Sequence, residues 1–432
     1  MKKSIVVGLV ALALIVLISP ALVGHLAQRS VDRQLEQTVD ENQEFVLTAT
    51  GYDRHWFTSD GQHRIEFANT PAGAALRAQL GLAGGSPALI IDTTLDHGPL
   101  PLASMHRDKG SLRPGLGRAE SHLSFEDASG TVTQLPGVVY TDIGLTGSVD
   151  SHLSLEAASI GDFSWGNADV YMQAGAQQKH RVTSGHLESL GVSKQDSRWS
   201  LDGIEFASDV TGTNYGFAIG ATRIAISSIS YSGPERSATN GPLLVQGNTA
   251  LNGDRVGGEV RMDMAFADLI TAGDSSLLLR LRFEDIDAAA AGRIKRQLGK
   301  SRNAAFGAEP AAVFGSVEED IQALLAAGFE LNVEQMDLQG VEGTLASDFR
   351  IKLEPSEPGA FAWASVLLKL EASANLSIPT TLYEFALLLN PNIGAAAAMG
   401  FLQKNGDNYE LAAAYEKGLL TINGAPMALP IR

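Results

Sequence analysis

Apolar and polar side chains alternate with a period of two in several segments of this chain, and this pattern constrains the fold more than any other feature. It is clearest where Val260, Met262, Met264 and Phe266 alternate with Arg261, Asp263 and Ala265. The same alternation recurs at Leu277–Phe283, Phe329–Val333 and Phe349–Leu353. Successive side chains of a strand point to opposite faces of a sheet, so each segment predicts a strand with one apolar and one polar face. Because parallel sheets are buried on both faces, the pattern indicates an antiparallel sheet covered on one side.

The longest alternation runs from Val366 to Ile378 and predicts an unusually long strand. A strand of this length suits an extended sheet better than a compact barrel. Near the other end of the chain, Asp60 and Gly61 separate Tyr52–Thr58 from Gln62–Ala68 and predict a two-residue hairpin turn, because both turn positions need a positive φ. We therefore expect a mainly β chain with a few α-helices, built on an extended, curved and mostly antiparallel sheet.

Three helical regions are expected late in the chain. Residues 285–300 are rich in alanine, and residues 316–327 end at Gly328, as helix C-termini commonly do. The third region, 380–403, follows the break at Pro379. We place all three within one exported β-rich region over 45–432. Its best linker, Glu354–Gly359, is followed by more of the strand pattern, so the number of domains stays open.

The N-terminus predicts a membrane anchor. Ser4–Gly24 is a run of 21 residues without a charge, preceded by Lys2 and Lys3. As a helix this run spans about 30 Å, the hydrocarbon thickness of a bilayer. It is longer than the apolar region of a cleavable signal peptide, which has about 7 to 15 residues. We expect residues 1–24 to form an uncleaved signal anchor.

Residues 25–44 extend this anchor. Leu26, Val31, Leu35 and Val39 recur at mostly four-residue steps, which predicts an amphipathic stalk helix. A short basic N-terminus before a single span normally stays in the cytoplasm. We therefore expect a single-pass protein of a bacterial inner membrane, with the bulk of the chain in the periplasm.

Charge and cysteine content exclude several classes of partner and site. The net charge is −17, with 49 acidic and 32 basic residues, so the average field repels phosphate backbones and nucleic acid is not an expected partner. The chain has no cysteine, which excludes disulfides, thiolate zinc sites and cysteine nucleophiles.

A search for chemical motifs gives no catalytic, cofactor-binding or metal-binding residues. No serine lies in a Gly-x-Ser-x-Gly turn, and Gly299, Lys300 and Ser301 lack the leading glycine of a phosphate loop, because position 294 is Ile. All nine histidines lie between His25 and His186, without the spacing of a zinc site. We interpret them as surface residues and expect no cofactor.

Short motifs at both ends of the chain resemble a known family. The first group is Tyr52, Arg54, Trp56, Phe57 and Ser59, followed by His97, Gly98, Pro99, Leu100 and Pro101. The second is Asp407, Tyr409, Tyr415, Gly418, Leu419, Thr421, Asn423, Gly424, Pro426 and Met427. With the N-terminal span they resemble the YdgA-like family of membrane-anchored bacterial envelope proteins, although position 55 is His where that family has Gly.

The resemblance implies inner-membrane attachment and an exported domain, and it supplies no reaction, cofactor or catalytic residue. From the residues themselves we interpret these motifs as structural. Aromatic side chains such as Tyr52 commonly anchor a sheet, and Gly98 with Pro99 commonly forms a turn.

Two classes of function follow. The first is a non-enzymatic binding or scaffold protein of the envelope, whose amphipathic sheet takes a lipidic or apolar ligand or another envelope protein. The second is a hydrolase or other envelope enzyme with a dispersed site around His97 and His106. A continuous dry groove favours the first class, and a polar pocket joining His with Asp or Ser favours the second. The sequence leaves the oligomeric state open.

Overall fold

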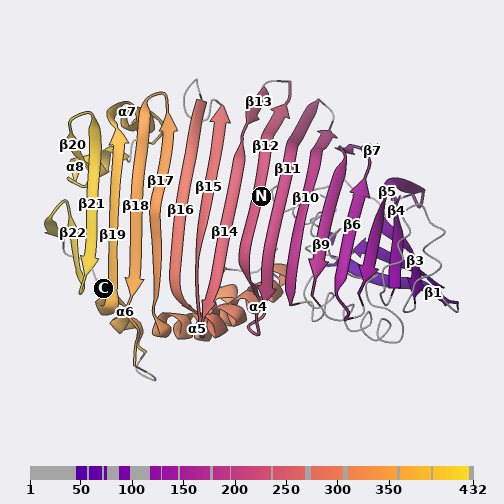
Figure 1. The fold of residues 1–432 in the computed structure, drawn as a ribbon. Helices are drawn as coiled ribbons and strands as arrows, with labels where there is room; N and C mark the ends of the chain where they lie inside the picture. The colour runs from indigo at the N-terminus through magenta and orange to yellow at the C-terminus, as the bar shows by residue number, and fades with distance from the viewer. Residues whose placement is uncertain are drawn as a thin grey trace. The chain divides into compact units, whose positions relative to one another are not determined.

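The computed structural model describes residues 45–55, 58–70, 73–74, 87–97, 117–127, 129–144, 146–175, 179–194, 196–234, 237–267, 274–304, 310–357, 361–390 and 393–427. Contacts between residues divide the chain into two compact units. The first comprises residues 1–190, 207–211 and 296–316, and the second comprises residues 191–206, 212–295 and 317–432. Strands make up most of both units, and the mainly β, antiparallel prediction is confirmed (Figure 1).

The first unit is an antiparallel meander in which each strand pairs with the next one along the chain. A short hairpin, β7 (Ala158–Ile160) with β8 (Phe163–Trp165), separates β6 from β9. The strands of the meander are β1 (Phe45–Arg54), β2 (Thr58–Phe67), β3 (Ala88–His97), β4 (Gly117–Glu126), β5 (Val132–Ile143), β6 (Val149–Leu155), β9 (Ala168–Ala174) and β10 (His180–Lys194).

The predicted hairpin turn at Asp60 and Gly61 is wrong. Both residues lie inside β2, where Asp60 pairs with Asp53 and Gly61 with Tyr52. The chain reverses earlier, and the His55 amide donates a hydrogen bond to the Thr58 carbonyl (2.8 Å). The Tyr52 ring lies 3.5 Å from the position that a Gly61 side chain would take. The Tyr52 ring thus packs beside Gly61, and we interpret this contact as favouring the strand at that position.

One face of the first meander is buried. Its core includes Ile91 and Ala119, each 0% exposed. Hydroxyl groups within this face pair across strands, Thr93 with Ser121 at 2.8 Å and Thr141 with Ser151 at 3.0 Å. A buried hydroxyl without a partner costs free energy, so these pairs allow polar residues inside an otherwise apolar layer.

The second unit is also an antiparallel meander. From β14 to β19 each strand pairs with the next, β21 follows β19, and β20 and β22 both pair with β21. Its strands are β11 (Ser197–Gly212), β12 (Ala218–Ser232), β13 (Ser237–Asn240), β14 (Leu243–Asn252), β15 (Arg255–Ala267), β16 (Asp274–Asp287), β17 (Phe329–Gly340), β18 (Gly343–Leu353), β19 (Leu370–Pro379), β20 (Gln403–Asn405), β21 (Asn408–Glu416), β22 (Leu419–Ile422) and β23 (Ala425–Met427).

A β-bulge interrupts β17. Val333 pairs with Leu281 and Phe349, and the next paired apolar residue is Met336 rather than the residue two positions on. β17 therefore contains one residue more than each of its two neighbours at this point. The bulge lets Met336 return to the apolar side of the sheet.

The helices fall near the expected regions, with different ends. They are α4 (Ala288–Ala304), α5 (Pro310–Ala327), α6 (Trp363–Lys369), α7 (Thr380–Leu389) and α8 (Ile393–Ala398). Asp285–Asp287, expected to be helical, belongs to β16, and the region 380–403 contains two helices and the first residue of β20.

The thirteen-residue strand predicted over Val366–Ile378 is only partly correct. Strand β19 begins at Leu370, which pairs with Leu353, the last residue of β18. Residues before Leu370 have no β18 residue left to pair with. They form α6 instead, in a segment rich in the good helix formers Ala, Leu and Lys.

Among the residues that the structure describes, no helix is both long and apolar enough to cross a bilayer. The expected anchor at 1–24 and stalk at 25–44 lie outside those residues.

Candidate functional site

An apolar face of the second unit is the most extensive candidate site. One cross-strand row on this face runs from β15 to β21 and consists of Val260, Leu281, Val333, Phe349, Ala374 and Ala413. A parallel row from β14 to β17 consists of Val245, Met262, Leu279 and Met336. These rows follow from the alternation in the sequence, because antiparallel pairing places the apolar residue of one strand opposite that of the next. We call this surface the apolar face.

Side chains of the two rows are half-buried or exposed, whereas Leu243, Val256, Leu353 and Tyr415 on the same face are buried. All six members of the longer row have intermediate exposure, and Met336 is 43% exposed. The covered face of the first unit differs, since Ile91 and Ala119 there are fully buried. The apolar face thus has the accessibility of a surface whose side chains shield one another but still contact solvent.

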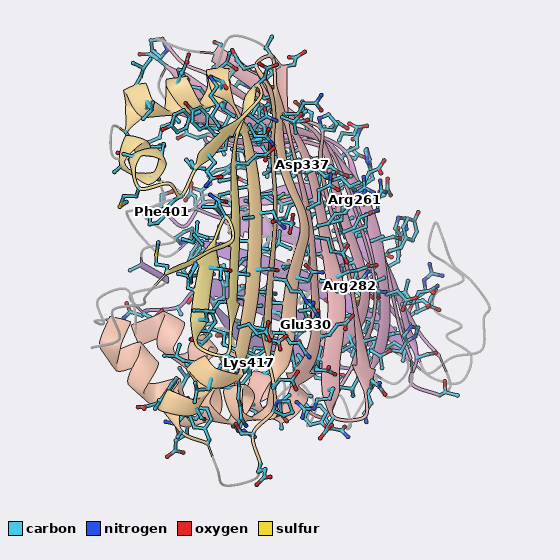
Figure 2. All side chains as sticks on the ribbon, turned by 90° about the vertical axis from the view of Figure 1, so that its left-hand side faces the viewer. Arg261, Arg282, Glu330, Asp337, Phe401 and Lys417 are labelled. Atoms are coloured by element: carbon cyan, nitrogen blue, oxygen red, sulfur yellow. The ribbon has the colours of Figure 1, made fainter. Side chains whose placement is uncertain are left out.

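Helices cover the two ends of this face. On α7, the Tyr383 ring stacks on Tyr409 of β21 at 4.0 Å between ring centroids. At the other end of β21, the Tyr415 hydroxyl donates a hydrogen bond to the Leu367 carbonyl of α6 (2.9 Å). The two tyrosines are six positions apart along β21, which corresponds to about 20 Å of strand. In Figure 2 these helices lie on the side of the sheet away from the labels Arg261 and Arg282. Helices therefore lie at both ends of the apolar face.

The opposite face of the second unit is charged. Ion pairs join Arg261 to Asp263 (2.8 Å), Arg282 to Glu334 (3.2 Å) and Arg350 to Glu330 (2.8 Å). Each pair involves an arginine that is about half exposed, so solvent screens the attraction and each contributes little to stability. This face is a solvated one.

A polar hollow of about 730 Å³ lies over β17 to β21, and Lys404 of β20 is among the residues that border it. Two carboxylates of its lining accept hydrogen bonds from side-chain amides. Asn375 Nδ2 donates to Asp348 Oδ1 (2.8 Å), and Asn405 Nδ2 donates to Glu410 Oε2 (2.9 Å). Its lining contains no histidine.

Asn423, predicted from the closing motif, borders this hollow and connects three segments. Its Oδ1 accepts a hydrogen bond from the Ala412 amide (2.8 Å), and its Nδ2 donates to the carbonyls of Gly400 and Phe401 (both 3.1 Å). Its φ is 49° and that of the following Gly424 is 78°, which suits the turn between β22 and β23. The geometry gives Asn423 the role of holding the chain after α8 against β21.

The other motif residues do not gather into one site. Tyr52 and Arg54 lie in β1, Ser59 in β2 and His97 at the end of β3, all in the first unit, whereas Asn423 and Gly424 belong to the second. Trp56, Phe57, Gly98 and Pro99 lie outside the described residues, as do the side chain of His97 and all of His106. The structure therefore does not describe the site expected around His97 and His106.

Several histidines form exposed pairs with carboxylates. His152 Nε2 is 3.0 Å from Asp169 Oδ1 and its ring stacks on Tyr171 at 4.2 Å, and His180 Nε2 is 2.8 Å from Asp209 Oδ1. These pairs lie on strand surfaces rather than in a pocket. In the described part of the chain, no group of three or more His, Asp or Glu side chains is arranged to hold a metal ion.

His63 was not predicted as a special residue, although it shares a strand face with the buried Ile65. It is 9% exposed, and burial lowers the pKa of its imidazole. Neither His63 Nδ1 nor the fully buried Ser59 Oγ has a hydrogen-bond partner among the described residues. Their positions on β2, four residues apart on one strand face, keep them from contacting each other.

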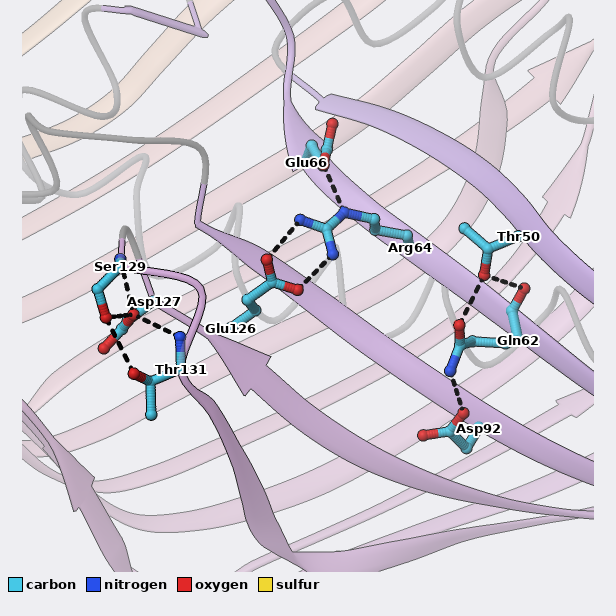
Figure 3. A network of polar contacts seen from close by, with 9 residues as sticks. All are labelled: Thr50, Gln62, Arg64, Glu66, Asp92, Glu126, Asp127, Ser129 and Thr131. Carbon is cyan, nitrogen blue, oxygen red and sulfur yellow. Dashed lines mark hydrogen bonds and ion pairs between the residues drawn. The ribbon is translucent and has the colours of Figure 1, made fainter.

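An ion-pair network occupies the outer face of the first unit (Figure 3). The Arg64 guanidinium donates to both carboxylate oxygens of Glu126 (2.5 and 3.1 Å) and to Glu66 (2.5 Å). These bonds raise the pKa of Arg64, and the bond from Arg64 lowers the pKa of Glu126. Nearby, Asp127 accepts hydrogen bonds from Ser129 and Thr131, which also lower the pKa of its carboxyl. All carboxylates of the network are occupied, so we interpret it as structural.

Comparison with known proteins gives one match. The model of a family described as "Bacterial protein of unknown function (DUF945)" matches residues 1–430. No curated protein and no solved structure matches the chain.

Proposed function

We propose that this chain, which belongs to the DUF945 family of bacterial proteins, is a non-enzymatic envelope protein that binds the acyl chains of a lipid on the apolar face of its second unit. The observation that supports this most is the row from Val260 to Ala413, which is apolar at every position and half-buried throughout. A surface of this kind is costly in water and suits an apolar ligand.

The size of the apolar face supports acyl chains as the ligand. Seven strands, β14 to β19 and β21, form its floor, and at about 4.8 Å per strand this floor is about 29 Å wide. Each methylene group that leaves water contributes about 0.8 kcal/mol. Ten such groups contribute about 8 kcal/mol before the cost of association is subtracted, which is enough for stable binding.

The expected location agrees with this ligand. An anchor at 1–24 would hold the chain at the bacterial inner membrane as a single-pass protein, with the apolar face in the periplasm and next to a source of lipid. Nucleic acid is not an expected partner of this acidic chain, and the proposed function requires no cofactor.

Lipid analysis of variants of the full-length, detergent-extracted protein tests the proposal. Met336→Asp places a carboxylate on the apolar face at a residue already 43% exposed, so the fold should tolerate it. Val333→Asp does the same in the centre of the longer row. The matched control is Asn332→Asp, which adds the same group one residue from Val333 on the charged face, between Arg282 and Arg350.

Mass spectrometry should find co-purified lipid with the unmodified protein and the Asn332→Asp variant, and at least tenfold less with Met336→Asp and Val333→Asp. Circular dichroism should show the same strand content in all four. Equal lipid in all four folded proteins would refute the proposal.

A further inference from the structure

We infer that the bound lipid is an anionic phospholipid whose headgroup is held by Lys404 at the α7 end of the apolar face. This inference rests on the proposed function and specifies its ligand. It comes from the distribution of charge over the face rather than from its apolar area.

Lys404 is the only charged residue at the paired strand positions of the apolar face, within the part of the second unit that the structure describes. The partners across strands place Leu, Ile, Val, Met, Phe, Ala, Tyr, Gly, Ser and Thr at every other such position from β12 to β23. Arginines and carboxylates of the same strands all belong to the opposite face. A single cation in an otherwise uncharged surface of this size calls for a functional explanation.

The position of Lys404 is fixed by an aromatic pair. Residue 404 lies in β20 opposite Tyr409, and its Nζ is 5.9 Å from the centroid of the Tyr409 ring. Tyr409 in turn stacks on Tyr383 of α7. A cation over an aromatic ring is attracted by the negative face of the ring, so the ammonium group is held at the edge of the apolar face.

The ammonium group of Lys404 is accessible to a ligand. The residue is exposed, and no described carboxylate lies within ion-pair distance of its Nζ. Two other lysines of this unit differ, since Lys352 pairs with Glu354 and Lys417 with Glu416. Among the described residues, the charge of Lys404 therefore has no carboxylate partner that an incoming anion would have to displace.

The apolar face fits a lipid with two acyl chains and one negative charge. Its floor of about 20 Å by about 29 Å accommodates two extended chains side by side. A phosphodiester beside Lys404 would form a charge-assisted hydrogen bond at the rim, while the chains lie over the apolar rows. Because the protein as a whole is strongly acidic, with a net charge of −17, this contact gives a local site for an anion that the average field disfavours.

Competition between two phospholipids tests the inference. The delipidated, detergent-extracted full-length protein is mixed with equimolar phosphatidylglycerol and phosphatidylcholine that carry the same acyl chains, and bound lipid is counted by native mass spectrometry. Lipid retained by Met336→Asp gives the background from detergent and any membrane segment. Above this background we expect phosphatidylglycerol to exceed phosphatidylcholine about tenfold, equivalent to about 1.4 kcal/mol.

Lys404→Gln should reduce that ratio to about one, and Lys404→Arg should retain it. Lys417→Gln removes an exposed lysine that already pairs with Glu416 and should leave the ratio unchanged. A ratio of about one in the unmodified protein, or an unchanged ratio in Lys404→Gln, would overturn the inference. Preference for oleate over phosphatidylglycerol in a parallel mixture would overturn the two-chain assignment. Failure of the proposed function is a different result, in which neither phospholipid binds above background.

Discussion

Two buried serines of the first unit show how much the environment of one hydroxyl group matters. Ser59 and Ser121 are both 1% exposed and both lie on the covered face of the meander. Ser121 Oγ pairs with Thr93 Oγ1 at 2.8 Å, whereas Ser59 Oγ has no hydrogen-bond partner among the described residues. Since burial is the same, the difference in their contribution to stability comes from the hydrogen bond.

Replacing each serine with alanine should give opposite results. Ser59→Ala removes an unpaired polar group and should leave the free energy of unfolding unchanged or raise it by up to about 1 kcal/mol. Ser121→Ala leaves the Thr93 hydroxyl buried without a partner and should lower the free energy of unfolding by about 1 to 2 kcal/mol. Urea denaturation of the two variants measures both effects. A loss of more than about 1 kcal/mol in Ser59→Ala would show that its hydroxyl has a partner after all.

At the scale of elements, the boundary between α6 and β19 separates two leucines that the sequence pattern treats alike. Leu368 lies in α6 and is 65% exposed. Leu370 begins β19 opposite Leu353, which is only 4% exposed. A uniform strand over this segment would put both leucines on the same face.

Aspartate substitutions should separate the two leucines. Leu370→Asp places a carboxylate beside buried Leu353 and should cost about 2 kcal/mol or more. Leu368→Asp should cost about 0.5 kcal/mol or less, as should the control Glu371→Lys at an exposed strand position. Thermal melts of the three variants are the measurement. Equal damage at 368 and 370 would instead support a continuous strand through both positions.

Much of the strand pattern was predictable, because alternation is a local property of the sequence. The segments around Val260, Leu277, Phe329 and Phe349 form β15 to β18 with the expected apolar side. Predictions failed where a neighbouring strand decides the outcome. Asp60 and Gly61 have the sequence of a turn, but Gly61 lies in a strand beside the Tyr52 ring. Val366–Lys369 alternates like a strand, but β18 ends at Leu353 and offers these residues no pairing partner.

The candidate site was predictable only in its general character. Long amphipathic strands indicate an apolar surface, which is what the apolar face presents. Lys404 could not be recognised, because the three-residue strand β20 is too short to show alternation and begins at the last residue of an expected helical region. The proposed role of Lys404 depends on its pairing with Tyr409 and on the lack of charge at the same face of the other strands. Neither feature can be read from the sequence around residue 404.

At the scale of the whole molecule, the expected topology gives a further prediction. Alkaline phosphatase fused after Arg432 should be active, because that enzyme forms its disulfides only in an oxidising compartment, and this cysteine-free chain has no thiol to interfere with them. Colony assays and fractionation measure activity and membrane attachment. An inactive fusion at full expression would contradict export, and release of the active fusion by osmotic shock would show cleavage of the anchor.

The bulge in β17 affects how this family of chains can change length. In a regular strand the loss of one residue turns every later side chain to the other face, which would bring charged residues onto the apolar face. Loss of Glu334 alone would instead leave Val333, Met336 and Leu338 at alternate positions and remove the one extra residue that β17 has at the bulge. This deletion would remove the ion pair between Glu334 and the half-exposed Arg282. Position 334 is thus one at which related chains can differ by a single-residue gap and still keep the same two faces.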